Sequence, residues 1–238
     1  MAIILFLATG SYKNFVLPTQ AEAWIYFGIA GIAYGFFERL RFFATKFLDA
    51  SIYSIVRNIS VLIAFFLSLF LYQESLTFSK MMGFVLIIIA LFLVVEIKKS
   101  KISLKGLWYG IVTSVLIGIG WSLDKKGSMF FNPETYNVMT WVAPLIIICI
   151  PSIDISAIKL EFKIFSWKII LLSLFNFIGY YLALKALFLA EATKVIPIMQ
   201  LSTLMTVIAG ILLLNEKNNL SKKILAGIIA VIGVFLLR

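Results

Sequence analysis

Residues 50–74 read ASIYSIVRNISVLIAFFLSLFLYQE, and residues 192–216 read ATKVIPIMQLSTLMTVIAGILLLNE. The two stretches lie 142 positions apart and share five identities, at Ala50, Ser60, Leu62, Leu71 and Glu74 and their counterparts. Both end on an amide–glutamate pair, and after each a Leu is followed seven residues later by the Gly that opens another apolar segment. This shared register predicts that the chain contains two related halves.

The rest of the chain is too apolar for an ordinary soluble domain. Of its 238 residues, 62% are hydrophobic and 13% are charged, and the mean hydropathy is +1.06, whereas soluble domains are about half apolar and about a quarter charged. Because a membrane-spanning helix needs roughly 20 apolar residues, the length accommodates about eight spans. Windows of this length without period-2 alternation favour helices over barrel strands. We predict spans at residues 24–47, 51–72, 80–95, 104–123, 136–150, 167–189, 194–214 and 222–237.

Several function classes have no support in the sequence. There is no His, and Cys149 is the single cysteine, so we expect no His–Cys metal site, no internal disulfide and no His proton relay. We find no P-loop, GxSxG, HExxH or CxxC motif, and we therefore expect no enzyme and no cofactor. The net charge of +10 is more typical of basic membrane loops and anionic lipid contact than of nucleic-acid binding. The N-terminal MAIILFLATG lacks a positive segment before its apolar run and does not indicate a secretory signal peptide.

The repeat predicts how the chain is organised. If the helices at 24–47, 51–72 and 80–95 match those at 167–189, 194–214 and 222–237, the second half, residues 98–238, has five helices. The first half, residues 1–97, then has about three full helices, and only Met1–Thr9 is left as the stub of another. An odd number of helices per half predicts that the second copy is inserted upside down. The expected fold is therefore an all-α polytopic membrane protein with an inverted five-helix repeat.

These motifs resemble the EamA-like branch of the drug/metabolite transporter superfamily. The resemblance rests on Gln73-Glu74 and Asn215-Glu216, each followed by a Leu and a Gly-led last helix, and it runs over about residues 24–238. It implies ten helices in two inverted halves and a secondary transporter, mostly an exporter of small metabolites or drugs, in the cell (inner or plasma) membrane. The chain departs from that pattern at its N-terminus, where about one and a half helices are absent. A missing helix pair would favour a homodimer that covers the exposed faces.

Two other functions stay open at this point. One is a translocator of a lipid-linked or phosphate-bearing headgroup, in which Arg57 and the basic loops would hold phosphate. The other is a truncated membrane protein that does not transport. The orientation is open as well. Thirteen Lys and Arg lie on one side and six on the other, which predicts an external C-terminus, whereas the family resemblance implies a cytoplasmic one.

The predicted solute-binding residues are polar groups at equivalent depths in the two halves. Tyr34 and Glu38 lie four residues apart on one helical face, and the repeat aligns them with Asn176 and Tyr180. Ionisable groups inside a span usually face a cavity or a partner. We expect Arg57 or Lys185 to attract an anionic group and Glu38 to bind a cationic group or the coupling proton. The predicted solute contacts are Tyr34, Glu38, Arg57, Asn58, Trp121, Asn176, Tyr180, Lys185 and Gln200.

Structural roles are the competing interpretation of the same residues. Arg39, Arg41 and Lys185 would reach the headgroups, Glu38 would pair with a neighbouring Arg, and Asn58 and Gln200 would bond between helices. Asp124-Lys125-Lys126 is most simply a solvated helix exit, although Trp121 and Asp124 are also cavity candidates. The pairs Gly31/Gly35 and Gly106/Gly110 are spaced for close helix packing.

Overall fold

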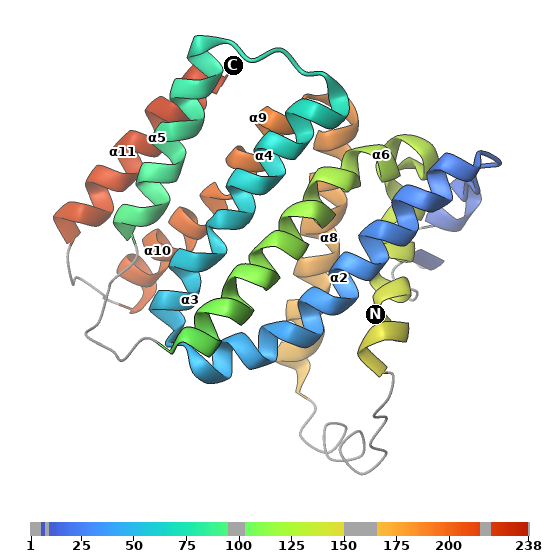
Figure 1. Ribbon diagram of the computed structural model, residues 1–238, viewed down its shortest axis with the longest axis horizontal. Helices are drawn as coiled ribbons and strands as arrows, with labels where there is room; N and C mark the ends of the chain where they lie inside the picture. The colour runs from blue at the N-terminus through green and yellow to red at the C-terminus, as the bar shows by residue number, and fades with distance from the viewer. Residues whose placement is uncertain (1–5, 8–9, 95–102, 150–165, 215–219, 238) are drawn as a thin grey trace. The chain divides into compact units, whose positions relative to one another are not determined.

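The computed structural model describes residues 6–7, 10–94, 103–149, 166–214 and 220–237, and every regular element in these ranges is helical (Figure 1). The predicted stub at Met1–Thr9 lies largely outside the described residues. The elements are the 3-10 helix η1 (Ser11–Asn14) and the α-helices α2 (Ala21–Phe47), α3 (Ala50–Arg57), α4 (Ile59–Tyr72), α5 (Phe78–Val94), α6 (Leu104–Cys149), α8 (Trp167–Leu189), α9 (Ala192–Met199), α10 (Leu201–Leu214) and α11 (Leu220–Leu237).

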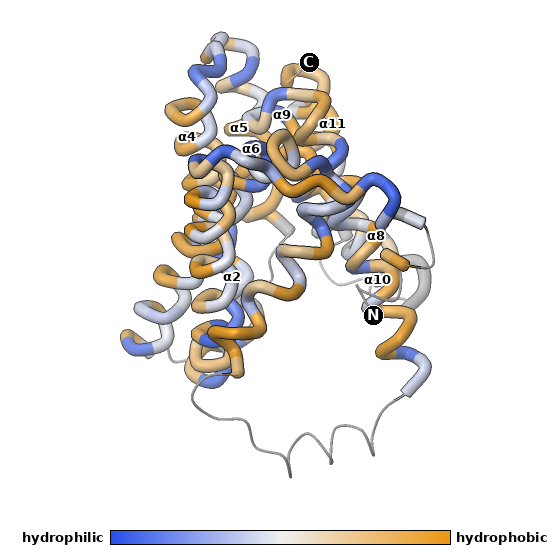
Figure 2. The backbone as a smooth tube through the Cα atoms, turned by 90° about the vertical axis from the view of Figure 1, so that its right-hand side faces the viewer, coloured by the Kyte–Doolittle hydropathy of each residue, from blue (hydrophilic) through white to orange (hydrophobic). Residues whose placement is uncertain are grey.

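Apolar residues run along most of the helical length (Figure 2). Among the described residues, three helical segments are long and apolar enough to cross a membrane, and they are Ile52–Tyr72, Leu104–Cys149 and Trp167–Leu189. The second of these is 46 residues long. At about 1.5 Å per residue it is longer than twice the roughly 30 Å of a hydrocarbon core. The non-helical residue Asn132 divides α6 into two parts. It lies between the predicted windows 104–123 and 136–150.

The helix bounds repeat at the spacing found in the sequence. Adding 142 to the bounds of α3 gives the bounds of α9, and adding 142 to the bounds of α4 gives the bounds of α10. The ends of α2 and α8, Phe47 and Leu189, are separated by the same number. The sequence similarity at 50–74 and 192–216 therefore has a counterpart in the local conformation of the backbone.

The chain divides into two compact units that differ from the predicted halves. The first unit comprises Met1–Arg39 and Leu123–Leu189, and the second comprises Leu40–Ser122 and Ala190–Arg238. Each unit thus combines segments from both halves of the sequence. The boundary between sequence halves at residue 97 stays a prediction.

In the first unit, α2 packs closely against the last part of α6. A Cβ added at Gly35 would lie 2.7 Å from the Cβ of Ile147, and one at Gly31 would lie 3.5 Å from the Cβ of Ala143. The close approach therefore needs a glycine at Gly35, whereas a Cβ at Gly31 would make an ordinary van der Waals contact. The predicted packing role is confirmed for Gly35.

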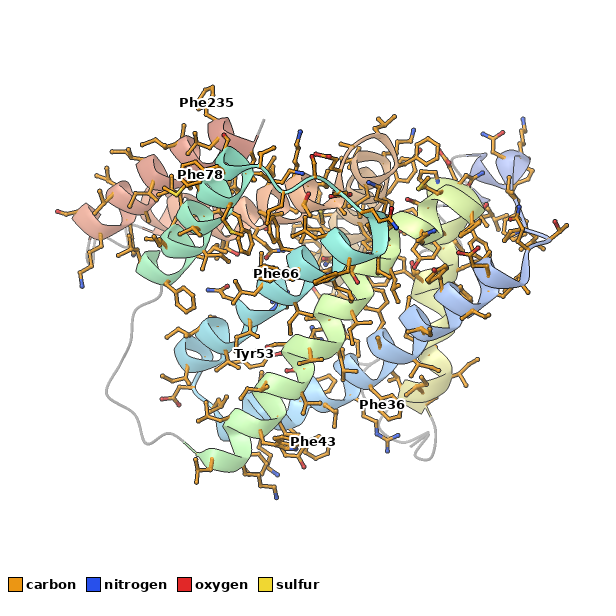
Figure 3. The ribbon with its side chains drawn as sticks, turned by 45° about the horizontal axis from the view of Figure 1, so that its top comes forward. Phe36, Phe43, Tyr53, Phe66, Phe78 and Phe235 are labelled. Carbon is orange, nitrogen blue, oxygen red and sulfur yellow. The ribbon has the colours of Figure 1, made fainter. Side chains whose placement is uncertain are left out.

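In the second unit, α5 and α11 lie side by side (Figure 1). A Cβ added at Gly83 would lie 2.6 Å from the backbone oxygen of Gly233, so only glycine permits this approach. Phe78 and Phe235 project outward from this pair (Figure 3) and are 83% and 63% exposed. The other predicted glycine pair is also confirmed in its packing role, because Cβ atoms at Gly106 and Gly110 would press on the side chain of Leu48.

Candidate functional site

The first unit contains a buried carboxylate. Asp124, on α6, is 2% exposed, and its oxygens accept three tyrosine hydroxyls. Tyr34 on α2 donates over 2.6 Å, Tyr180 on α8 over 2.9 Å, and Tyr136 on α6 over 3.3 Å. In the described residues, no Lys or Arg lies within ion-pair distance of this carboxylate. We call Asp124 and its three tyrosine donors the Asp124 cluster.

The break in α6 brings Tyr136 back to Asp124. Twelve residues of straight helix would separate the two side chains by about 18 Å. Asn132 has φ 58 and ψ 160, which is not helical, and it precedes Pro133, whose ring disfavours a helical conformation in the residue before it. The Asn132 Oδ1 then accepts the Thr135 N–H over 2.9 Å as an N-cap of the following helical segment. The chain therefore turns at Asn132-Pro133, and Tyr136 comes within hydrogen-bond distance of Asp124.

Apolar side chains surround the Asp124 cluster. Ala23, Phe131, Tyr136 and Leu184 form a buried core, and Phe27 and Met139 pack on it. Gly127 lies directly against Tyr136, because a Cβ at this glycine would be 2.0 Å from the ring. These contacts hold the Tyr136 ring near the carboxylate, and Asp124 and Tyr136 are both buried.

A second polar group of the first unit joins α6 to α8. The Tyr181 hydroxyl donates to Glu134 Oε1 over 2.6 Å, and Lys185 Nζ lies 3.5 Å from the same oxygen. The Lys185 ammonium also lies 4.8 Å from the centre of the Tyr181 ring. The ion pair gives Lys185 an internal anionic partner in this conformation.

The structure brings together two of the five predicted solute contacts in the first unit. Tyr34 and Tyr180 meet at Asp124, although the sequence repeat did not align these two with each other. Asn176 is exposed and donates to the backbone oxygen of Leu172 in its own helix over 3.0 Å. Glu38 is half-buried one turn beyond Tyr34, and Lys185 is exposed and pairs with Glu134.

Two of the four predicted solute contacts in the second unit lie where one helix ends and the next begins. Asn58 separates α3 from α4, and Gln200 separates α9 from α10. At both places the backbone N–H bonds to the carbonyl three residues back, over 3.1 Å to Ile55 and 3.2 Å to Pro197. Arg57 is exposed beside the first interruption, and Trp121 packs on the buried cluster around Phe65. Equivalent sequence positions therefore adopt the same tightened turn.

A polar group also lies at the start of α9 in the second unit. Lys80, 3% exposed, and Lys194 both lie 3.1 Å from Glu191 Oε2. Burial raises the pKa of Glu191, but hydrogen bonds from Lys194 and Lys80 outweigh it and hold the pKa below its ordinary value. A cavity of about 140 Å³ lies beside these residues and Ser75. Among the described residues, no group of acidic or cysteine side chains is arranged to hold a metal ion.

The sequence profile of the EamA-like transporter family matches residues 1–96 and 104–238 of the chain. The chain belongs to the EamA-like transporter family. The resemblance drawn from the Gln73-Glu74 and Asn215-Glu216 motifs is thereby confirmed. No curated protein shows significant sequence similarity to the chain. EamA-like transporters are polytopic membrane proteins that act on small solutes and are not enzymes, and these properties set the context for the Asp124 cluster.

One prediction about this EamA-like transporter is wrong. Asp124-Lys125-Lys126 is not a solvated helix exit, because α6 continues to the turn at Asn132 and Asp124 is buried. Polar residues after an apolar window indicate an exit, but two of the three tyrosines that surround the carboxylate lie 90 and 56 residues away in the sequence. The Asn132-Pro133 dipeptide was the signal that could have placed the helix end correctly.

Proposed function

We propose that this protein is a secondary transporter that exports a small metabolite or drug-like solute across the cell (inner or plasma) membrane. Transport would proceed by alternating access between two inverted halves. Family membership supports the general class. The observation that carries the mechanism is the pair of helix interruptions at Asn58 and Gln200, which lie at repeat-equivalent positions.

Interrupted helices suit alternating access for a physical reason. A tightened turn inside a helix is a frequent place for a hinge, because local hydrogen bonding can rearrange there without breaking the whole helix. The proposal gives Asn58 and Gln200 this hinge role and, with Arg57 and Trp121, contact with the solute. In the first unit it gives solute contact to Tyr34, Glu38, Asn176, Tyr180 and Lys185.

The inverted arrangement follows if each apolar segment is a span. We propose that α2, α3–α4, α5, the two parts of α6, α8, α9–α10 and α11 each cross the membrane, which makes about eight spans. The helix α8 is then the fifth crossing after α2. Because five is odd, the two repeat-equivalent helices run in opposite directions.

A substrate-panel assay tests the function. The purified protein is reconstituted in liposomes that are loaded with amino acids, nucleosides or cationic dyes, and efflux is compared with that from protein-free liposomes. We expect at least one solute class to leave faster with the protein. If none does while circular dichroism shows the helical fold intact, the transporter proposal is wrong.

Two variants test the hinge positions. We expect Asn58→Leu and Gln200→Leu to slow efflux several-fold, because each variant removes the amide side chain at a proposed hinge and solute contact. Ser54→Ala is a matched control in α3, since Ser54 is exposed and bonds only within its own helix. Equal rates in all three variants would contradict the hinge role.

A homodimer is part of the same proposal. Only 6% of the apolar window of α8 is buried, and Trp167, Leu172 and Phe175 are all more than 60% exposed. A second copy or lipid would cover this face. Cross-linking in native-like membranes distinguishes the two, because Phe175→Cys in a Cys149→Ser background would cross-link only in a dimer built on α8.

A further inference from the structure

Among the residues that the structure describes, no Lys or Arg lies within ion-pair distance of the buried Asp124 carboxylate, and an unpaired charge is costly in an apolar environment. A buried charge needs compensation by pairing or by hydrogen bonds. Two ion pairs on the same helices join other groups: Lys126 on α6 pairs with Glu22 on α2 over 3.6 Å, and Lys185 on α8 pairs with Glu134 on α6 over 3.5 Å. The compensation present at Asp124 comes from three tyrosine hydroxyls.

Hydroxyl partners differ from a lysine or an arginine in one important respect. A tyrosine hydroxyl both donates and accepts, whereas an ammonium or guanidinium group only donates. The three hydroxyls can therefore donate to a charged carboxylate, and one of them can turn to accept from a protonated carboxyl group. The cluster stays hydrogen-bonded in both charge states.

We propose that Asp124 is the proton-binding site of this transporter and that its protonation is coupled to movement of α2 and α8 against α6. The proton adds to one carboxylate oxygen and removes one negative charge, with no other bond made or broken. Hydrogen bonds to an ionised acceptor are roughly twice as strong as neutral ones. Protonation therefore weakens the contacts of Tyr34 and Tyr180, which tie α2 and α8 to α6. The coupling rests on the proposed transport function, but proton binding does not.

Infrared difference spectroscopy tests proton binding without a transported solute. The purified protein is titrated in lipid between about pH 3 and about pH 10, a range that begins below the ordinary carboxyl pKa of about 4, and the carbonyl stretch of protonated carboxylic acids is followed. We expect a titrating band that Asp124→Asn removes and that the matched control Glu134→Gln retains. A band that is unchanged in Asp124→Asn would overturn the proposal.

Tyr34→Phe and Tyr180→Phe provide a second test, which does not depend on whether Asp124→Asn folds. Each removes one donor to the charged form while leaving the carboxyl group in place. We expect the midpoint of the band to move to higher pH by about 1 to 2 units, because a hydrogen bond to a charged group contributes about 1.5–3 kcal/mol. Tyr181→Phe, which loses its bond to Glu134, should leave the midpoint unchanged. Equal midpoints in all these proteins would overturn the role of the cluster.

Transport measurements then test the coupling of protonation to solute movement separately from proton binding. With a solute identified in the panel assay, we expect Asp124→Asn to keep solute exchange between equal pools and to lose at least ten-fold of the efflux driven by an imposed pH gradient. Glu38→Gln tests the carboxylate that the sequence favours for the same role. Gradient-driven efflux that survives in Asp124→Asn and is lost in Glu38→Gln would assign coupling to Glu38 and overturn this proposal. Failure of wild-type efflux would instead contradict the transport function.

Discussion

The Glu74 carboxylate, at the end of α4, accepts hydrogen bonds from both the backbone N–H and the hydroxyl of Thr193 in the first turn of α9. It also accepts the N–H of Ala192 over 2.8 Å. A carboxylate at a helix N-terminus satisfies donors that the helix itself leaves unpaired and interacts favourably with the helix dipole. Glu74 belongs to the motif by which the sequence resembles its family, and this contact gives that motif a structural role.

Replacing Glu74 should destabilise the protein. In Glu74→Gln, the uncharged amide loses the favourable charge at the α9 N-terminus and one of its acceptor oxygens. We expect a loss of about 1–3 kcal/mol in the free energy of unfolding, measured by thermal unfolding in detergent. Glu22→Gln is the control, because the Glu22 side chain is 56% exposed and its pair with Lys126 should contribute little. Equal melting temperatures for the two variants would contradict the capping role of Glu74.

Gly127→Ala should disturb the first unit more than any substitution at an open glycine. The new Cβ would lie 2.0 Å from the Tyr136 ring, and the ring has to move. Overpacking of this kind costs about 1–3 kcal/mol. Gly28→Ala and Gly179→Ala are the controls, since a Cβ there meets nothing within 4 Å, and alanine favours helix by up to about 1 kcal/mol. The melting temperature of Gly127→Ala should be lower than those of both controls. Any other order would show that the Tyr136 ring is not held at this contact.

The turn in α6 predicts which of two Asn132 variants is the more stable. Asn132 has φ 58 and ψ 160, a conformation that glycine adopts far more readily than other residues. Asn132→Ala should therefore lose the N-cap and keep the strain that Asn132 already carries, at a cost of about 1 kcal/mol, whereas Asn132→Gly should lose the cap at a cost of a few tenths of a kcal/mol and relieve the strain. Melting temperatures measured side by side check this order. A more stable Asn132→Ala protein would mean that the backbone at Asn132 is not as described.

The ion pairs of Glu191 predict a pH dependence. Its pKa is lower in the folded protein than in the unfolded chain, so the unfolded chain binds the proton more tightly. The stabilisation is therefore present above the unfolded value of about 4.3 and is lost as the pH falls through the lower folded-state pKa. We expect wild type to lose more stability between about pH 6 and about pH 3 than Glu191→Gln does. Parallel curves for the two proteins would contradict this contribution.

Much of the fold could be predicted from residues 50–74 and 192–216. Composition alone indicates helices, because backbone groups in a bilayer must be paired within the segment. The 142-residue spacing also predicts where the interruptions recur, since Asn58 and Gln200 are aligned in the sequence and both separate two helices. The end of the first part of α6 could not be placed by hydropathy, because Asp124, Lys125 and Lys126 are polar and still lie within the helix.

The candidate site was only partly predictable for a related reason. Tyr34 and Tyr180 stood out as polar residues inside apolar windows, but nothing in their spacing indicates a shared partner. The competing interpretation of Asp124 as a solvated exit rested on its neighbours Lys125 and Lys126. In a sequence, the exposure of a charged residue is predicted from its neighbours along the chain. Its burial in the folded protein depends on which helices surround it.

By itself, the sequence determined that this protein is a helical membrane protein of the EamA-like transporter family with an internal repeat. These properties depend on local hydropathy and on the register of short motifs, which are read along the chain. The tertiary structure alone decided that a single carboxylate collects hydroxyls from α2, α6 and α8. Tyr34 and Tyr180 lie 90 and 56 residues from Asp124 along the chain, and only helix packing and the turn at Asn132 bring such distant groups within hydrogen-bond distance.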